Sequence, residues 1–174
     1  MNQRIEILQG DITKFAGAAI VNAANSYLLG GGGVDGAIHR AAGPKLGLEC
    51  LMLGGCKTGQ AKITKGYRLP VRSIIHTVGP VWRGGNQREA ELLTNCYQHS
   101  LELAAKHQLE ALAFPAISCG IYGYPVELAA PIAIQTIDSF LATNSIPEKV
   151  SLICFETTVY QAYCAAWAIY QTNL

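Results

Sequence analysis

The sequence predicts an α/β fold in three layers, with helices covering both faces of a β-sheet. Short apolar segments alternate along the chain with longer segments whose apolar residues recur at helical spacing. Hydrophobic residues make up 50% of the chain and charged residues 14%, which favours strands buried on both faces. The chain of 174 residues suffices for one sizeable core, and no segment is typical of a linker. We therefore expect a single domain over residues 1–174.

The first half of the chain predicts two strands followed by two helices. Residues 5–8 and 18–21 are short apolar segments of strand length. Residues 34–42 are expected to form a helix, because the Gly43-Pro44 pair that follows is typical of a helix end. A second helix is expected at 45–53, where two glycines follow.

The second half of the chain continues the alternation. Residues 61–64 and 72–78 are expected as strands, and the second is rich in β-branched side chains. Residues 88–107 carry a stripe of apolar side chains at helical spacing. The remaining elements are expected as a strand at 112–114, a helix at 126–142, a strand at 150–155 and a terminal helix at 160–170.

Composition and charge exclude several classes of function. The formal net charge is +1 and there is no basic run, so we expect no extended nucleic-acid surface. The N-terminus lacks the apolar core of a signal peptide, and no apolar run is long enough to cross a membrane. The six cysteines show no Cys-x-x-Cys pair and no spacing typical of a metal site. We therefore expect a cytoplasmic protein with reduced thiols, no metal and no membrane partner.

The strongest functional signal lies in the stretch from Asn22 to Arg40, where four consecutive glycines, Gly30 to Gly33, follow an expected strand and precede an expected helix. We call residues 22–33 the four-glycine loop. Consecutive glycines expose backbone N–H groups that can approach an anion without interference from a Cβ. The helix N-terminus behind them adds unpaired donors and a partial positive charge. The segment therefore predicts a phosphate-binding site flanked by two amides and a carboxylate. The residues concerned are Asn22, Asn25, Gly30, Gly31, Gly32, Gly33, Val34 and Asp35.

Gly31, Gly33 and Gly36 match G-x-G-x-x-G in form, but they do not predict a dinucleotide site. The loop between the strand and the first glycine is too long for the tight turn of that fingerprint. The chain contains no Gly-Lys-Ser or Gly-Lys-Thr, which excludes a P-loop. The four-glycine loop is therefore interpreted as a long anion-binding loop.

A second loop, residues 115–125, also follows a buried strand and precedes a helix. Ligands of α/β sheets bind outside the carboxyl ends of the strands, where both loops would emerge. Two such loops can hold a diphosphate from opposite sides, with Tyr122 against a sugar. The alternative is that both are ordinary strand–helix turns. The expected ligand contacts of the second loop are Ser118, Cys119, Gly120, Ile121 and Tyr122.

Asp35 and His39 lie four residues apart on an expected helix, so their side chains share a face. Asp35 can accept a proton from water while His39 orients it or tunes its charge. Alternatively, Asp35 stabilises only the helix N-terminus by its charge. His76, within a β-branched strand, is interpreted as a hydrogen-bonded core residue. A nucleophilic Cys119 is disfavoured, because no histidine is placed to activate it.

Several motifs together resemble one known family over residues 5–155. They are Gly10-Asp11-Ile12-Thr13, Asn22-Ala23-Ala24-Asn25, Gly30 to Arg40, His76-Thr77-Val78-Gly79-Pro80 and Phe114 to Pro125. The set resembles the macrodomains, and the Gly-Gly-Gly-Gly-Val-Asp-Gly segment is similar to the MacroD-type ADP-ribosyl hydrolases among them. The resemblance implies a mixed, largely parallel sheet between helices, with ADP-ribose in a cleft at one sheet edge.

The resemblance also implies how the nucleotide is held. Asp11 would bond the adenine amino group, Ile12 would give a backbone contact, and Phe155 would stack near the adenine. Capping of the following turn is an alternative role for the Asp11 carboxylate. The two glycine-containing loops would hold the diphosphate. Cys119 stands where the family usually has threonine.

The resemblance finally implies a reaction at the distal ribose, surrounded by Asn25, Asp35 and His39. Similar enzymes cleave mono-ADP-ribosyl groups from acidic side chains and deacetylate O-acetyl-ADP-ribose, without a metal or other cofactor. The resemblance implies that the attacking water would be held between a phosphate oxygen of the substrate and the aspartate. We therefore expect a monomeric ester hydrolase whose partners are ADP-ribose, its esters and mono-ADP-ribosylated proteins. The alternative is a reader module that binds ADP-ribose without turnover.

Overall fold

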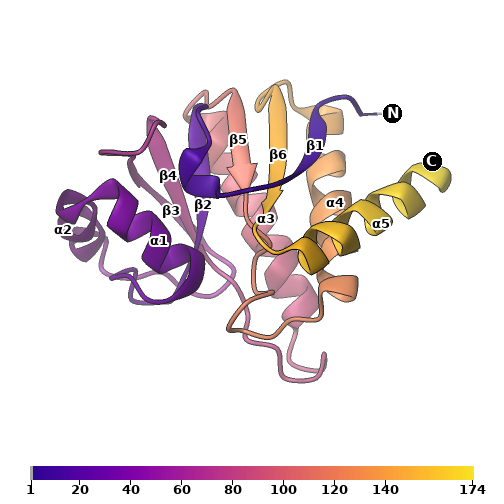
Figure 1. The fold of residues 1–174 in the computed structure, drawn as a ribbon, viewed down its shortest axis with the longest axis horizontal. Coiled ribbons are helices and arrows are strands. Elements are labelled where there is room, and N and C mark those ends of the chain that lie inside the picture. The colour runs from indigo at the N-terminus through magenta and orange to yellow at the C-terminus, as the bar shows by residue number, and fades with distance from the viewer. Residues whose placement is uncertain (1) are drawn as a thin grey trace.

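A six-stranded mixed sheet forms the centre of the computed structural model, which describes residues 2–174 (Figure 1). The strand order is β1-β6-β5-β2-β4-β3, and every neighbouring pair is parallel except β3 with β4. The predicted mixed, largely parallel sheet is thus confirmed. The strands are β1 (Ile5–Gln9), β2 (Ala19–Ala24), β3 (Ala61–Lys65), β4 (Ser73–Val78), β5 (Ala111–Phe114) and β6 (Lys149–Cys154).

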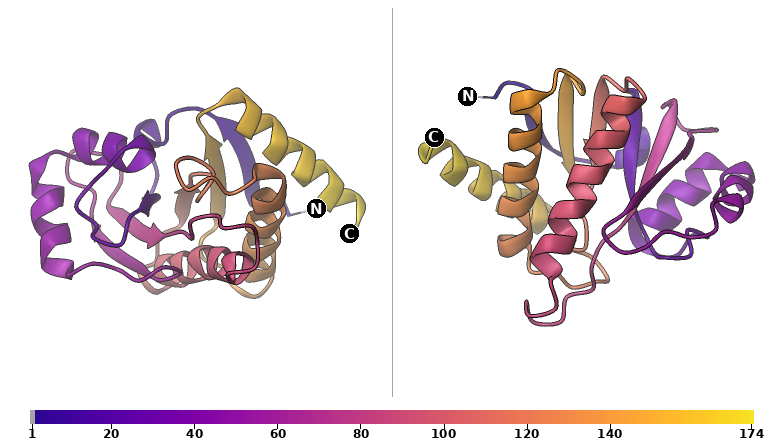
Figure 2. Two further views of the ribbon diagram at one scale, coloured as in Figure 1. Left: turned by 90° about the horizontal axis from the view of Figure 1, so that it is seen from below. Right: turned by 180° about the vertical axis from the view of Figure 1, so that it is seen from behind.

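Helices flank the sheet on both faces, as the sequence predicts. Figure 2 shows α3 and α4 together on one face, while α1 and α2 pack near β2 and β3 on the other. The last helix, α5, packs against α4 and β1. Among residues 2–174, no helix has both the length and the hydropathy needed to span a bilayer. The helices are α1 (Gly33–Ala42), α2 (Pro44–Leu53), α3 (Glu89–Lys106), α4 (Val126–Thr143) and α5 (Thr157–Thr172), with a 3₁₀ turn η1 at Ile12–Lys14.

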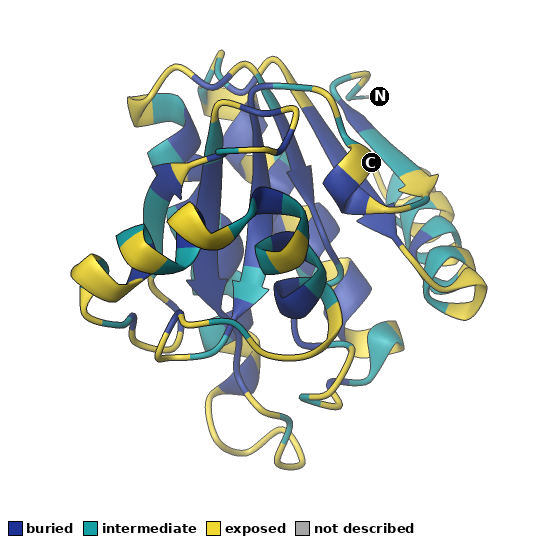
Figure 3. Ribbon diagram, turned by 60° about the vertical axis from the view of Figure 1, so that its left-hand side comes forward, coloured by how far each residue is buried: buried dark blue, intermediate teal, exposed yellow. Residues whose placement is uncertain are grey.

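The core consists of two clusters separated by the sheet. Successive side chains of a strand point to opposite faces. Ile20 of β2 therefore packs with the cluster under α1 and α2, and Val21 packs with the cluster under α3 and α4. Both side chains are almost completely buried. Figure 3 shows the central strands buried between helices that expose only their outer faces.

The fold opens a crevice between β2 and β5. The two strands pair only from Ala19 to Ile20 on β2, opposite Leu112 and Ala113 on β5. Beyond this point β2 leads into α1 on one face, whereas β5 leads into α4 on the other. In α/β sheets such a reversal leaves a ligand-binding crevice outside the carboxyl ends of the strands. The topology therefore brings the four-glycine loop and the second loop to opposite sides of one opening.

Candidate functional site

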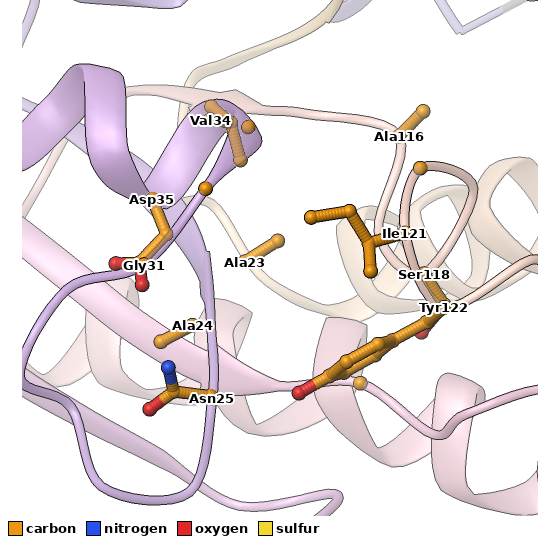
Figure 4. A pocket seen from close by; sticks show the side chains of 14 residues that line it. Ala23, Ala24, Asn25, Gly31, Val34, Asp35, Ala116, Ser118, Ile121 and Tyr122 are labelled. Atoms are coloured by element: carbon orange, nitrogen blue, oxygen red, sulfur yellow. The ribbon is translucent and has the colours of Figure 1, made fainter.

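A cavity of about 150 Å³ lies between the four-glycine loop and the second loop (Figure 4). The sequence-predicted contacts that line it are Asn25, Gly31, Gly32, Gly33, Val34, Asp35, Ser118, Gly120, Ile121 and Tyr122. Four further lining residues were missed by the sequence reasoning, namely Ala23, Ala24, Gly79 and Ala116. Their common signal is a small residue within three positions of the end of a buried strand, where a ligand can approach the backbone.

Asn25 shapes the four-glycine loop. Its Oδ1 accepts hydrogen bonds from the backbone N–H groups of Tyr27 at 3.1 Å and Leu28 at 3.2 Å. Its Nδ2 donates to the carbonyl oxygen of Gly30 at 3.0 Å. Leu28, fully buried with a φ of 62°, anchors the same turn in the core. Asn25 therefore orders the loop and places its amide at the cavity wall (Figure 4).

The backbone of the four-glycine loop supports anion binding. Gly30 and Gly33 have φ values of 92° and 58°, in the left-handed region that favours glycine. The N-cap of α1 is Gly32, which has no side chain to accept hydrogen bonds from the N–H groups of the first turn. The N–H groups at the start of α1 therefore stand at the cavity with the positive end of the helix dipole.

Asp35 brings a carboxylate to the cavity wall while remaining only 4% exposed. Its Oδ1 accepts a hydrogen bond from Asn22 Nδ2 at 2.8 Å. His39 Nε2 lies 3.5 Å from the same oxygen but makes no hydrogen bond to any described residue. Burial raises the pKa of Asp35, and the Asn22 hydrogen bond and the His39 charge only partly offset this effect.

The second carboxylate oxygen, Asp35 Oδ2, is the one left for a ligand. It accepts no hydrogen bond from residues 2–174. A Cβ built on Gly31 would lie 3.2 Å from Oδ2 and 3.3 Å from Asn25 Nδ2, so the two groups converge on the same point. Oδ2 and the amide of Asn25 can therefore share one small ligand, such as a water molecule.

The structure corrects the expectation that Asn22 contacts the ligand. β2 continues to Ala24 instead of ending at Val21, so Asn22 lies inside the strand and is 0% exposed. Its side chain supports Asp35 from within the core and does not line the cavity. His39 also lies behind Asp35, on the next turn of α1, and does not line the cavity.

The opposite wall is the second loop. Ser118 has a φ of 66°, and its buried hydroxyl has no hydrogen-bond partner among the described residues. Ile121 and Tyr122 extend from this loop toward the four-glycine loop (Figure 4). A Cβ on Gly32 would lie 3.3 Å from Ile121 Cδ1, so the two loops almost meet at this point. An anion in the cavity would contact both loops.

Cys119 does not line the cavity, in contrast to the sequence-based expectation. Its side chain packs against the core cluster under α3 and α4. Burial raises the pKa of the Cys119 thiol to about 12, so the thiol stays protonated at neutral pH. A nucleophilic role for Cys119 is therefore disfavoured by the structure as well as by the sequence.

Asp11, Ile12 and Phe155 lie at the ends of β1 and β6, outside the cavity. The two strands pair in register up to Gln9 and Cys154, which brings Asp11 and Phe155 to the same sheet edge. Phe155 is 78% exposed, while the Ile12 side chain is buried. Asp11 Oδ1 accepts hydrogen bonds from Thr13 N at 2.9 Å and Thr13 Oγ1 at 2.7 Å, so the capping role is confirmed. These bonds lower the pKa of Asp11.

Other reactive side chains are dispersed. Within residues 2–174, no three His, Cys, Asp or Glu side chains converge as a metal site would require. All six cysteines are free thiols. His76 is 0% exposed and hydrogen-bonded, as the sequence predicts for a core histidine. Among the described residues, Asp35 is thus the carboxylate side chain that lines the cavity.

Known proteins are similar to this chain in fold and in sequence. A family model described as Macro domain matches residues 21–133, more than half of the chain. A macro domain-containing protein of Chlorobaculum tepidum is 61% identical over 168 residues, which cover 95% of this chain and 98% of the relative. An O-acetyl-ADP-ribose deacetylase of Escherichia coli K12 is 52% identical over 160 residues, 90% of each chain. A solved variant of the Oceanobacillus iheyensis macrodomain with ADPR superposes with a TM-score of 0.93 at 45% identity, covering 97% of this chain and 94% of that one.

Proposed function

The chain belongs to the macro domain family, and on this premise we propose that it hydrolyses carboxylate esters of ADP-ribose. The substrates are O-acetyl-ADP-ribose and mono-ADP-ribosyl groups on acidic side chains of proteins. Two similarities support this substrate class. A relative at 52% identity is named as an O-acetyl-ADP-ribose deacetylase, and a structural neighbour at 45% identity was solved with ADPR.

The nucleotide would lie along the carboxyl edge of the sheet. The adenine would stack near the exposed ring of Phe155, beside Asp11. The diphosphate would lie between the start of α1 and the second loop, where N–H groups of the helix N-terminus and Ser118 line the cavity. The distal ribose would then reach Asn25 and Asp35.

The observation that carries the hydrolase proposal is the free oxygen of Asp35. Oδ2 meets the cavity beside Asn25 Nδ2, while Oδ1 is held by Asn22. A water between Oδ2 and a substrate phosphate oxygen attacks the ester. The ester C–O bond breaks, and the carboxylic acid and ADP-ribose leave. Asp35 takes one proton of the water and passes it to the ribose oxygen released from the ester, which regenerates the carboxylate. Its burial-raised pKa makes it a stronger base than an exposed aspartate.

A paired assay tests this proposal. Calorimetry measures ADP-ribose affinity, and the same sample is incubated with O-acetyl-ADP-ribose and with a protein mono-ADP-ribosylated on glutamate. Binding with release of free ADP-ribose supports the hydrolase, and an Asp35→Asn variant gives the matched control. Binding without release from either substrate would leave a reader module. Absence of binding would refute the assignment of both loops.

A further inference from the structure

A buried polar network lies behind Asp35, and the proposed reaction makes no direct use of it. The network joins Thr64 on β3, His76 on β4, Asn22 on β2 and Asp35 on α1. We propose that His76 is a positioning residue that orients the Asn22 amide toward Asp35 Oδ1, so that Oδ2 stays free for the attacking water. This inference rests on the proposed function for its kinetic part only.

The contacts of the network are short, and the side chains that make them are buried. Asn22 Nδ2 lies 2.8 Å from Asp35 Oδ1 and 3.1 Å from His76 Nδ1. His76 Nε2 lies 2.8 Å from Thr64 Oγ1. Asn22 and His76 are 0% exposed and Thr64 is 4% exposed. The register of β2 and β4 pairs Asn22 directly with His76, so the sheet itself sets this contact.

The chemistry of the groups fixes one direction of donation. The Asn22 NH₂ group only donates, so its two hydrogens go to Asp35 Oδ1 and to His76 Nδ1. His76 Nδ1 must then accept, which puts the ring proton on Nε2, where it donates to Thr64 Oγ1. The Thr64 hydroxyl donates onward to the Lys65 carbonyl at 3.2 Å. A flipped Asn22 amide would instead set its carbonyl oxygen against the Asp35 carboxylate, which can only accept while it is ionised.

The surroundings of His76 keep the ring neutral. Two further groups face it: the His39 ring, with centroids 6.4 Å apart, and Cys50 Sγ, 3.9 Å from Nε2. Burial lowers the pKa of His76 to about 3, and burial raises the pKa of the Cys50 thiol to about 11. His76 Nδ1 therefore remains an acceptor at any pH at which the enzyme would work.

An unpaired buried oxygen in the network indicates that Asn22 serves function rather than stability. Asn22 Oδ1 is buried and has no hydrogen-bond partner among the described residues. A buried carbonyl without a partner destabilises a fold, and an apolar side chain would avoid that penalty. The penalty is accounted for if Asn22 serves to present its amide to Asp35.

A pair of His76 substitutions tests the kinetic role. His76→Leu removes the acceptor, and we expect kcat to fall about 10- to 100-fold with ADP-ribose affinity unchanged. Without the His76 acceptor, the Asn22 amide is no longer held toward Asp35. Loss of the hydrogen bond from Asn22 to Asp35 raises the pKa of Asp35 further, so the acidic limb of the kcat profile should move to higher pH. The residues that face Asp35, namely Asn22, His39 and Asn25, are themselves unchanged in this variant. His76→Gln retains an acceptor and should restore most of kcat.

His107→Gln, at an exposed position, is the matched control and should behave as wild type. A His76→Leu variant with wild-type kcat would overturn the proposal. So would a loss of kcat without a shifted pH profile and without rescue by glutamine, because that pattern indicates a structural role alone.

A second measurement needs neither a variant nor turnover. Nitrogen-15 NMR of the wild-type protein reports the His76 tautomer, and we expect an unprotonated Nδ1 and a protonated Nε2 near neutral pH. The opposite tautomer would overturn the proposal even if the enzyme is active. Conversely, the expected tautomer in a wild-type protein that releases no ADP-ribose would refute the proposed function and not the orientation of Asn22.

Discussion

Replacing Gly31 by alanine would put a methyl group beside the Asp35 oxygen that faces the cavity. The new Cβ would lie 3.2 Å from Asp35 Oδ2 and 3.3 Å from Asn25 Nδ2, slightly closer than ordinary van der Waals contact. Gly31 has no positive φ, so alanine can adopt its backbone conformation. The neighbours must move by only a few tenths of an ångström. We therefore expect the fold to persist, because the entropy gain of about 0.4–1 kcal/mol from Gly→Ala offsets this strain.

The same methyl group would occupy the space in which the attacking water is proposed to lie. We expect kcat for O-acetyl-ADP-ribose to fall about 100-fold, which corresponds to ~2.7 kcal/mol of lost transition-state stabilisation. ADP-ribose affinity should stay within about threefold, because the N–H groups of the loop keep their positions. The rate of ADP-ribose release measures kcat, and calorimetry measures ADP-ribose affinity.

Gly47→Ala is the matched control for this substitution. Gly47 lies within α2, and a Cβ there would meet no atom within 4 Å. It should leave turnover unchanged and stabilise the helix by about 0.5–1 kcal/mol. Wild-type kcat in Gly31→Ala would refute the placement of the water beside Asp35 Oδ2. A loss of affinity with normal kcat would show instead that Gly31 acts in binding.

The other substitutions test the carboxylate, the anion site and the loop contact. Asp35→Asn should lower kcat about 10²- to 10⁴-fold with affinity retained; unchanged turnover would exclude Asp35 as base. Because burial raises the pKa of Asp35, the native state binds its proton more readily than the unfolded state, so this carboxylate destabilises the fold above the ordinary aspartate pKa. Asp35→Asn should therefore raise Tm at neutral pH. The difference in Tm between the variant and the wild type should shrink in acid, where Asp35 is protonated, and a constant difference would contradict this reasoning. Gly32→Glu puts a negative charge at the α1 N-terminus and should weaken ADP-ribose binding at least about 100-fold by calorimetry; normal affinity would refute the phosphate site. Gly79→Ala would overlap Ser118 Oγ and approach Ile117 Cγ2 to 2.8 Å. The substitution should lower the free energy of unfolding by about 1–3 kcal/mol. An unchanged Tm would show that the second loop can move away without cost.

Much of the architecture could be predicted because it depends on local patterns. Apolar spacing and glycine or proline stops located every strand and helix to within a few residues. Gly31 to Gly33, followed by Asp35, located one wall of the cavity, since helix N-termini and bare backbone attract anions wherever they occur. Gly30, also expected as a contact, does not line the cavity. The second loop was found in the same way. These features depend on residues close together in the chain.

The position of Asn22 could not be predicted, because it depends on pairing with a distant segment. The apolar run of β2 stops at Val21, yet hydrogen bonding to β4 extends the strand to Ala24 and carries Asn22 into the core beside His76. Gly79 was missed as a cavity residue for a related reason, since its role depends on contact with Ser118.

The sequence by itself therefore determined the order of the elements, the two loops and the carboxylate between them, through periodicity and backbone chemistry. Only the tertiary structure decided where β2 and β5 separate, and which oxygen of Asp35 is held and which is free. The physical reason is that strand registers and buried hydrogen bonds join residues far apart in the chain. Asn22 and His76 are 54 positions apart, a pairing that no local pattern encodes.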